Sequence, residues 1–418
     1  MVTPNMAVEA APVAAAARIV AVETVRTPLQ ANVLFVRLHA ADGQVGLGET
    51  FYGAQSVEDY IHETAALILA DESCAAPARI AGSLPSYVGY SGSGAEVRAN
   101  SAIDIALWDL LGKRSGQPLR HLLGGPVVDT IQVYNTCAGG NYVRAESRQA
   151  SSNWGMSNGG PRRPYEDLWR FLNEPGPLAR DLWDQGYRGM KVWPFDLAAE
   201  AARGAHTADL RPGLRILDQI REAVGEEMAL YVELHSLWQP KGAERLLTAL
   251  QPYRVAWAED PLRPDHYLAL GILRETCGVP IAAGENVGAG YNAYKPLLDA
   301  RAIDVAIIDI GWSGGITQAM KTAALAEQYS VPVAPHDCTG PVGLAVASHF
   351  VTTVPNGFVQ EVARAFYHGW YPEVSTGFPV ITDGYIRPAD TPGHGVSLPD
   401  SLLSSSTVAR RLTRVASR

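Results

Sequence analysis

The sequence predicts an α/β fold in which a (β/α) barrel follows a smaller α+β domain. Three apolar runs end in Glu233, Glu259 and Glu285, and the two intervals between these glutamates are equal, at 26 residues. A repeat of about that length holds one strand and one helix, which is the unit of a (β/α) barrel. Strand-like and then helical segments precede this alternation, an order that is typical of a separate α+β domain.

The composition indicates a globular protein. The chain has 418 residues, of which 47% are hydrophobic, enough for one large barrel and a smaller domain. The formal net charge of -9 argues against nucleic acid as a partner, and no apolar run reaches the roughly 18 residues of a membrane span. The cysteines have no metal-site or disulfide spacing, which favours reduced thiols in the cytoplasm. They are Cys74, Cys137, Cys277 and Cys338.

The N-terminal part of the chain is expected to form the α+β domain over residues 18–127. Residues 1–17 are alanine-rich without a basic start, which indicates a disordered leader. The runs RIVAVETV and NVLFVRLHA predict strands. Apolar residues at helical spacing from Ala99 to Leu111 predict an amphipathic helix that ends at Gly112.

Eight strand-like runs at a steady interval predict a barrel over residues 128–365. The first two are residues 130–137 and 189–193, and a polar stretch between them, residues 141–164, predicts a long loop at the mouth. Polar side chains end seven of the runs. These residues are Lys191, Glu233, Glu259, Glu285, Asp309, His336 and Glu361.

The remainder of the chain lacks a strong period. Residues 366–400 are rich in proline and glycine and are expected to return to the first domain. The Ser- and Arg-rich tail, residues 401–418, is expected to be frayed.

The three equally spaced glutamates predict a metal site. Neighbouring parallel strands would bring Glu233, Glu259 and Glu285 together at the C-terminal mouth of the barrel. Clustered anions repel one another unless a cation lies among them, and oxygen ligands favour a hard ion, Mg²⁺ first and Mn²⁺ second. The alternative is that these acids only cap the following helices.

Histidines at two strand ends can supply acid and base. Removing a proton next to a carboxylate gives a dianionic enediolate, which requires a divalent cation and a positioned base. His336 and Asp309, on adjacent strand ends, would form a base dyad. His235 would face the same cavity as Glu233 and could protonate a departing hydroxide, although a core histidine is the alternative.

Other strand ends and one loop are candidates for substrate contact. Lys191 could bind a substrate carboxylate or act on its opposite face. Glu361 could hydrogen-bond a carboxylate if protonated or a hydroxyl if ionised. Trp193 and Asn135 at strand ends, and Tyr52 in a glycine-containing loop, complete the set.

At these residues the chain resembles the mandelate racemase subgroup of the enolase superfamily, and specifically its acid-sugar dehydratases. The resemblance covers about residues 18–398. Its motifs are SAIDIALWDLLGKRSGQPLRHLLGG (101–125), WAEDP (257–261), AGEN (283–286), Asp309 with Gly314-Gly315, APH (334–336) and TPGHGVSL (391–398).

The resemblance implies a modified, enolase-like TIM-type barrel whose N-terminal capping domain is completed by the C-terminal segment. It implies Mg²⁺ ligation by Glu233, Glu259 and Glu285, and a base formed by His336 with Asp309. It also implies a mobile lid made of loops near residues 27–32 and 52–55.

Two residues distinguish the chain within the subgroup. Trp193 replaces the second lysine of the Lys-x-Lys base motif, which argues against a two-base racemase. The pair Glu233-x-His235 instead resembles dehydratases that use one histidine as base and another as acid.

We therefore expect a Mg²⁺-dependent dehydratase of carbohydrate catabolism that converts a sugar acid to a 2-keto-3-deoxy acid and assembles as a homo-oligomer, from dimer to octamer. The alternative is a cycloisomerase, epimerase or racemase that uses the same enediolate. A metal-dependent barrel hydrolase fits less well because no HxH follows the first strand. A catalytically silent binding protein would be expected to lose strand-end residues that are all present here.

Overall fold

The computed structural model describes residues 17–70, 72–85, 92–156, 164–288 and 290–415. The expected leader, apart from Ala17, lies outside the described residues, as do residues 157–163 of the expected mouth loop.

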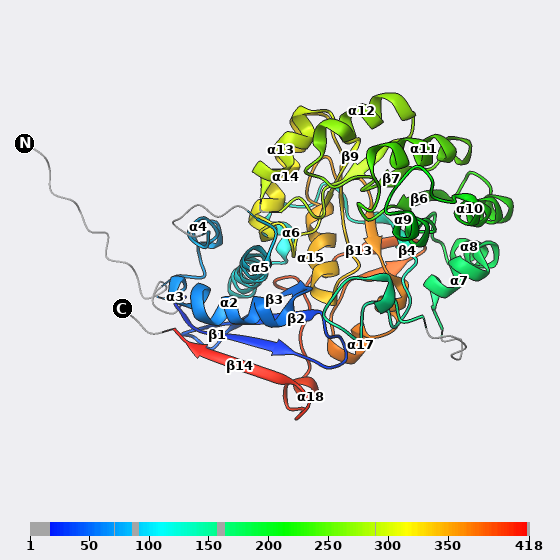
Figure 1. Cartoon of the computed structure of the whole chain (residues 1–418). Coiled ribbons are helices and arrows are strands. Elements are labelled where there is room, and N and C mark those ends of the chain that lie inside the picture. The colour runs from blue at the N-terminus through cyan, green and yellow to red at the C-terminus, as the bar shows by residue number, and fades with distance from the viewer. Residues whose placement is uncertain (1–16, 71, 86–91, 157–163, 289, 416–418) are drawn as a thin grey trace, which may run out of the picture.

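An antiparallel sheet with helices on one face forms the capping domain (Figure 1). Its strand order is β14-β1-β2-β3. The strands are β1 (Ile19–Arg26), β2 (Val33–Ala40), β3 (Val45–Phe51) and β14 (Ala409–Arg414). The helices are α2 (Ala54–Tyr60), a π-helical turn (Ile61–Ala65), α3 (Ala66–Ile68), α4 (Pro77–Ser83), α5 (Ala95–Ser115) and α6 (Leu119–Leu122). Apolar residues of the sheet, such as Leu34 and Val36, pack with Ile103 and Leu107 of α5.

Helix α5 continues past the predicted end at Gly112. It ends at Ser115, with Gly116 in the left-handed region at φ 67°. Gly112 stays inside the helix because it provides space for the returning chain: a Cβ there would lie 2.6 Å from the Cα of Gly393. The glycine therefore marks a close approach of two segments and not a helix end.

The expectation of a frayed tail is wrong for most of that segment. Residues 400–403 form α18 (Asp400–Leu403), and β14 pairs with β1 from Arg414 opposite Ala21 to Ala409 opposite Arg26. Arg410 of β14 donates a 2.7 Å hydrogen bond to the buried Glu23 of β1. The basic residues that suggested a solvated tail are therefore partners of acids in the first domain.

All eight predicted runs are parallel strands of one sheet that curls into a barrel. They are β4 (Ile131–Thr136), β5 (Gly189–Val192), β6 (Ala229–Glu233), β7 (Trp257–Glu259), β8 (Ile281–Ala283), β9 (Val305–Ile308), β10 (Val333–Pro335) and β11 (Gln360–Val362). Strands β4 to β10 pair in sequence order, and β11 pairs with β4. Within the described residues β10 and β11 are joined only by an isolated bridge, Val333 to Gly357, so the strand ladder is not continuous there.

Helices surround the barrel strands (Figure 1). They are α7 (Asp167–Asn173), α8 (Pro175–Asp184), α9 (Asp196–Ala202), α10 (Arg211–Val224), α11 (Pro240–Leu250), α12 (Tyr267–Cys277), α13 (Tyr291–Asp299), α14 (Gly315–Gln328), α15 (Pro341–Val351), α16 (Arg364–Tyr367) and α17 (Tyr371–Val374), with 3₁₀ turns at Ser151–Asn153 and Gln251–Tyr253. Among the described helices none is long and apolar enough to cross a membrane.

The C-terminal segment contacts the barrel before it reaches the capping domain. The hairpin of β12 (Val380–Thr382) and β13 (Tyr385–Arg387) extends the sheet next to β4. The chain then crosses to α5 and α6: Gly393 accepts the amide of Leu119 at 2.8 Å, and the amide of His394 donates to Asp109 at 3.2 Å.

Candidate active site

The barrel brings three glutamates together at its C-terminal mouth. Glu233 and Glu259 are direct neighbours in the β6–β7 ladder, and Glu285 lies two residues beyond the end of β8. One carboxylate oxygen from each lies within 4.8 Å of the others, and all three side chains are buried. The equal sequence spacing therefore produces one acidic cluster.

Each glutamate has one carboxylate oxygen in a hydrogen bond with a neighbouring group. Glu233 Oε1 accepts the amide of His235 at 2.7 Å, Glu259 Oε2 accepts Trp257 Nε1 at 2.8 Å, and Glu285 Oε1 accepts Asn286 Nδ2 at 2.8 Å. Such contacts orient metal ligands in advance of binding.

Lys191 is the cation that contacts this cluster. Its Nζ lies 2.9 Å from Glu259, 2.8 Å from Glu361 and 3.4 Å from Glu233. Burial alone would lower the pKa of Lys191, but the charges of Glu259 and Glu361 raise it well above its usual value. For Glu361, burial would raise the pKa, but the charge of Lys191 lowers it. The resulting ionised Glu361 is an acceptor for a hydroxyl group.

The acidic cluster fits a hard divalent cation. Burial raises the pKa of Glu259 to about 8, with Lys191 opposing and Glu233 adding to the shift, and burial also raises the pKa of Glu285. A group of buried carboxylates that resists ionisation in this way is stabilised by added positive charge. The donor atoms are all oxygen, which matches Mg²⁺ or Mn²⁺.

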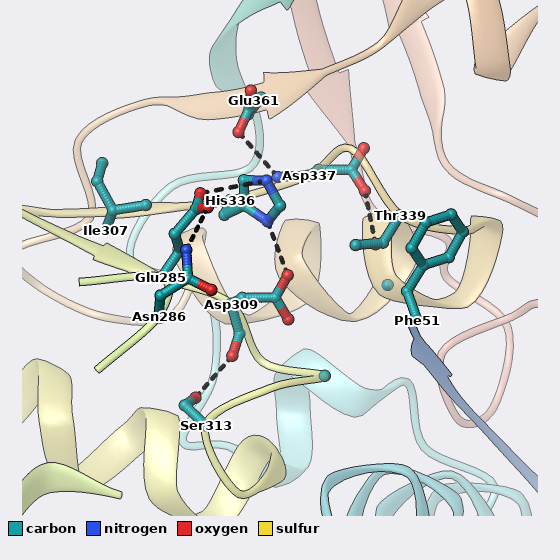
Figure 2. Close-up of polar contacts among 12 residues, drawn as sticks. Phe51, Glu285, Asn286, Ile307, Asp309, Ser313, His336, Asp337, Thr339 and Glu361 are labelled. Atoms are coloured by element: carbon teal, nitrogen blue, oxygen red, sulfur yellow. Dashed lines mark hydrogen bonds and ion pairs between the residues drawn. The ribbon is translucent and has the colours of Figure 1, made fainter. Parts of the chain in front are cut away.

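His336 lies between two carboxylates beside the cluster (Figure 2). Its Nδ1 is 2.7 Å from Asp309 Oδ2, and its Nε2 is 3.3 Å from Glu285 Oε2. Burial would lower the pKa of His336, but the charge of Glu285 and the hydrogen bond with Asp309 raise it well above its usual value. The structure thus places the two residues of the expected dyad within hydrogen-bonding distance.

His235 belongs to a second histidine–carboxylate pair. Its Nδ1 is 2.6 Å from Oδ2 of Asp196, the first residue of α9. Burial opposes protonation, but the charge of Asp196 and then that of Glu233 raise the pKa of His235 to about 10. Sequence reasoning did not identify Asp196, although it is the first acidic residue after the second barrel strand.

The two histidines lie on opposite sides of the barrel. His235 follows β6 and His336 follows β10, and these strands are four positions apart in the strand order. In a ring of eight strands this is the largest possible separation. The acidic cluster on β6 to β8 lies between them in the strand order.

The backbone at the site adopts left-handed conformations without glycine. His235 has φ 47°, Ser236 has φ 58° and Asp260 has φ 42°. Each such residue costs roughly 1–3 kcal/mol and persists only where surrounding contacts fix it. Here the amide of His235 donates to Glu233 Oε1 at 2.7 Å. The amide of Ser236 donates to the carbonyl of Asp260 at 2.8 Å. The strain places the His235 ring at the cavity.

A cavity of about 20 Å³ separates the predicted residues, room for about one water molecule. Its walls include Tyr52, Lys191, Trp193, Glu233, His235, Glu285, His336 and Glu361, all of them predicted, together with Thr136, Tyr142, Gln149, Trp312 and Cys338, which sequence reasoning missed. Glu259 and Asp309 are not in the walls, but they contact the wall residues Lys191 and His336. Tyr142 and Gln149 come from the predicted mouth loop, whose lack of apolar period gave no indication of individual contacts.

Asn135 does not line the cavity, contrary to expectation. Its Nδ2 donates to Asp167 at 3.0 Å, and its Oδ1 accepts the amide of Arg364 at 2.9 Å. Successive residues of a strand face opposite sides, so the next residue, Thr136, faces the cavity instead. The geometry therefore gives Asn135 a structural contact between β4 and Arg364, and not a place in the cavity wall.

The loops expected to form a lid contact the mouth of the barrel. Asn32 donates a 2.8 Å hydrogen bond to the carbonyl of Glu146 in the mouth loop. Tyr52 packs against Trp312 with ring centroids 5.6 Å apart, and Trp312 packs on the His336 ring at 4.9 Å. Their movement stays a prediction.

Comparisons with known proteins agree with this architecture. Residues 6–124 match the family described as mandelate racemase / muconate lactonizing enzyme, N-terminal domain, and residues 177–402 match the enolase C-terminal domain-like family. A crystal structure of an enolase of the mandelate racemase subgroup from Agrobacterium tumefaciens is 37% identical, with a TM-score of 0.84, and the match covers 96% of this chain and 100% of that one.

Two curated relatives are named as sugar-acid enzymes. A D-xylonate dehydratase from Haloferax volcanii is 27% identical over 375 residues, 87% of this chain and 83% of the relative. A D-galactonate dehydratase family member from Catenulispora acidiphila is 31% identical over 315 residues, 75% of this chain and 70% of the relative. Dehydratases of this kind are hydro-lyases, so the comparisons support an enzyme of the lyase class. With a capping domain, a (β/α) barrel and matches to both family descriptions, the chain belongs to the enolase superfamily, in its mandelate racemase subgroup.

Proposed function

We propose that the protein is a Mg²⁺-dependent dehydratase that removes the proton α to the carboxylate of a sugar acid and eliminates the β-hydroxyl to give a 2-keto-3-deoxy acid. The observation that carries this proposal is the presence of two histidine–carboxylate pairs, His336–Asp309 and His235–Asp196, across the barrel from each other. The relatives named as D-xylonate and D-galactonate dehydratases support a sugar acid as the substrate.

Glu233, Glu259 and Glu285 would hold the cation, because each already directs one oxygen to the cluster. A bound Mg²⁺ would stabilise the negative charge that develops on the substrate carboxylate during proton removal.

His336 is the base in this proposal. Asp309 holds Nδ1, so the neutral ring keeps its proton there and presents the unprotonated Nε2 toward the acidic cluster. Nε2 is thus the atom that accepts the α-proton. Asp309 then stabilises the imidazolium that forms.

His235 is the acid that protonates the leaving hydroxyl. Asp196 holds its Nδ1 and raises its pKa, which favours the protonated form at neutral pH. The largest contribution to the raised pKa of His336 comes instead from Glu285, a member of the acidic cluster. Positive charge in the cluster would therefore oppose the largest raising contribution at His336, whereas the largest one at His235, from Asp196, lies outside the cluster.

Polar groups around the cavity can orient the substrate. Lys191 would pair with the substrate carboxylate, and ionised Glu361 would accept a hydroxyl hydrogen bond. The buried indole nitrogens of Trp193 and Trp312 have no acceptor in the part of the chain that the structure describes. A buried donor without a partner costs free energy, so substrate oxygens are natural partners for both.

A screen of the Mg²⁺-loaded protein against a library of sugar acids tests the proposal, with 2-keto acid formation as the readout. We expect at least one acid to give a keto acid. An epimer or lactone product without keto acid would contradict dehydration and support the isomerase alternative.

We also propose a cytoplasmic location and a homo-oligomeric assembly for the enzyme. Cys74, Cys137 and Cys277 are buried and unpaired, which suits a reducing cytoplasm. The expected homo-oligomer stays a prediction that light scattering on the purified protein can check.

A further inference from the structure

We propose that four capping-domain residues, Glu49, Thr50, Ser101 and Asp104, are positioning residues for the catalytic base. They hold the two barrel loops that follow Asp309 and His336. The inference rests on the proposed function, because it takes His336 as the base.

Glu49 binds the helix that begins five residues after His336. It lies on β3 and is 2% exposed. Its two carboxylate oxygens accept the amides of Val342 at 3.1 Å and Gly343 at 3.0 Å, in the first turn of α15. The first amides of a helix have no partner inside it, and the carboxyl oxygens of Glu49 satisfy two of them. A carboxylate of one domain thereby fixes the start of a helix in the other.

Gly340 leaves room for the Glu49 carboxyl group beside the start of α15. A Cβ on Gly340 would lie 2.5 Å from the Glu49 carboxylate, so the loop after His336 needs glycine at that position. Figure 2 shows the end of β3, at Phe51, beside the loop that carries Thr339. The loop from His336 to α15 is thus in contact with the capping domain.

Asp104 makes the equivalent contact with the helix that follows Asp309. Its Oδ2 accepts the amide of Thr317 at 2.9 Å and its Oδ1 accepts the Thr317 hydroxyl at 2.6 Å, in the first turn of α14. A Cβ on Gly315 would collide with this carboxylate. The glycine pair of residues 314 and 315, singled out in the sequence, therefore permits the approach of Asp104.

Two hydroxyl groups bind the loop between Asp309 and α14. Thr50 Oγ1 donates to the carbonyl of Gly311 at 2.8 Å, and Ser101 Oγ accepts the amide of Gly314 at 2.8 Å. Trp312, which packs on His336, lies between these two contacts in the sequence. The capping domain thus restrains the loops on both sides of the dyad.

The acid pair is held differently. His235 and Asp196 both come from barrel segments, and the amide of His235 donates to Glu233 in the same domain. Loosening the domain contact should therefore displace the base while leaving the acid in place. A misplacement of about 1 Å at a reacting group can cost up to about 100-fold in rate.

Asp109 provides a control carboxylate on α5 whose contacts lie within the capping domain and the returning C-terminal segment. It is a buried carboxylate of α5 that accepts the amides of Leu47 at 2.8 Å and His394 at 3.2 Å. These partners belong to neither dyad loop. Asp109→Asn should therefore lower the stability of the capping domain without moving His336.

The test compares Glu49→Gln, Asp104→Asn and the milder Thr50→Val with Asp109→Asn in the full-length protein. We expect the first three to lower kcat and the rate of α-proton exchange with D₂O by roughly 10- to 100-fold. KM should change less than kcat, because Lys191, Glu361 and the three clustered glutamates are not on the loosened loops. The isotope effect on an α-deuterated substrate should rise, whereas Asp109→Asn should leave it unchanged even at an equal loss of thermal stability.

The NMR signal of the His336 ring gives a readout that needs no turnover. In histidine-labelled protein, the signal is assigned by its loss in His336→Asn. It should shift in Glu49→Gln, Asp104→Asn and Thr50→Val. It should stay in place in Asp109→Asn. The proposal is overturned if the signal does not move in Thr50→Val and in those of Glu49→Gln and Asp104→Asn that fold. An equal shift in the control, Asp109→Asn, would also overturn it. An inactive wild type would refute the proposed function alone, because the ring shift would still decide the positioning role.

Discussion

Each of the three glutamates at the mouth of the barrel has one carboxylate oxygen in a hydrogen bond, and together the side chains form one acidic cluster. The sequence interval could predict these residues, since strand ends repeat with the barrel unit. It could not predict Asp196, the first residue of α9, or Trp312, in the turn after β9, because neither ends a strand. Asn135 shows the remaining limit: a strand end locates a position, and a shift of one residue changes the face.

Glu259→Gln tests the metal site at the scale of one oxygen atom. The amide can still accept the Trp257 indole hydrogen bond, so the fold should persist. The substitution removes the charge that a hard cation requires, so Mg²⁺-dependent turnover should fall to the rate measured without enzyme. The measurement is keto acid formation with and without Mg²⁺, and full activity of EDTA-treated wild-type protein would contradict the role.

Replacing the two histidines should give different losses. Removal of a general acid or base costs about 10²- to 10⁴-fold in rate, so His336→Asn and His235→Asn should both lose at least that much elimination. In D₂O, His235→Asn should still exchange the α-proton, because the base remains. His336→Asn should show neither exchange nor elimination. Exchange retained in His336→Asn would make Lys191 the candidate base.

Strand β14 shows why one element escaped prediction. Its sequence, ARRLTR, has no apolar alternation, and five of its six residues are exposed. Contacts with residues far away in the sequence hold β14 in the sheet, chiefly that of Arg410 with Glu23. Glu23 also binds Arg37 and His39 of β2. Burial would raise the pKa of Glu23, but hydrogen bonds from His39 and Arg410 and the charge of Arg37 lower it to about 2.

This carboxylate predicts a stability that depends on pH. The folded-state pKa of Glu23 lies below its ordinary value of 4.5, so its contribution is present above that value and is lost as the pH falls toward 2. Glu23→Gln should therefore lower the unfolding midpoint at about pH 7 and lower it progressively less toward about pH 3. The partly exposed Glu244, paired with Lys241, is the control, since Glu244→Gln should change the midpoint little at either pH.

At the scale of the whole molecule, the eight strands were predictable because their spacing is local and periodic. The contacts between capping domain and barrel were not, because single residues such as Glu49 and Asp104 reach helix ends more than 200 residues away. The motifs that carried the family resemblance include Ser101, Asp104 and the Gly314-Gly315 pair, and only the structure shows what these residues contact.

Metal removal should change the stability of the entire protein. A ligand that binds only the folded state adds about 2.7 kcal/mol when its concentration is 100 times its Kd. Mg²⁺ should therefore raise the unfolding midpoint of the wild type, and EDTA should reverse the change. In Glu259→Gln the midpoint should not respond, and an equal response in that variant would argue for binding elsewhere.

The pairing of β1 with β14 also has a consequence for synthesis on the ribosome. Ile19 begins β1 and Ala409 begins β14, so the ribosome adds about 390 residues between them. At typical elongation rates of about 5–20 residues per second, the edge of β1 remains without its neighbour for roughly 20 to 80 s. An open strand edge invites pairing with another nascent chain, and an inward-pointing charge discourages it. Until Arg410 arrives, Glu23 Oε1 lacks this partner, and we expect the buried carboxylate to discourage such pairing.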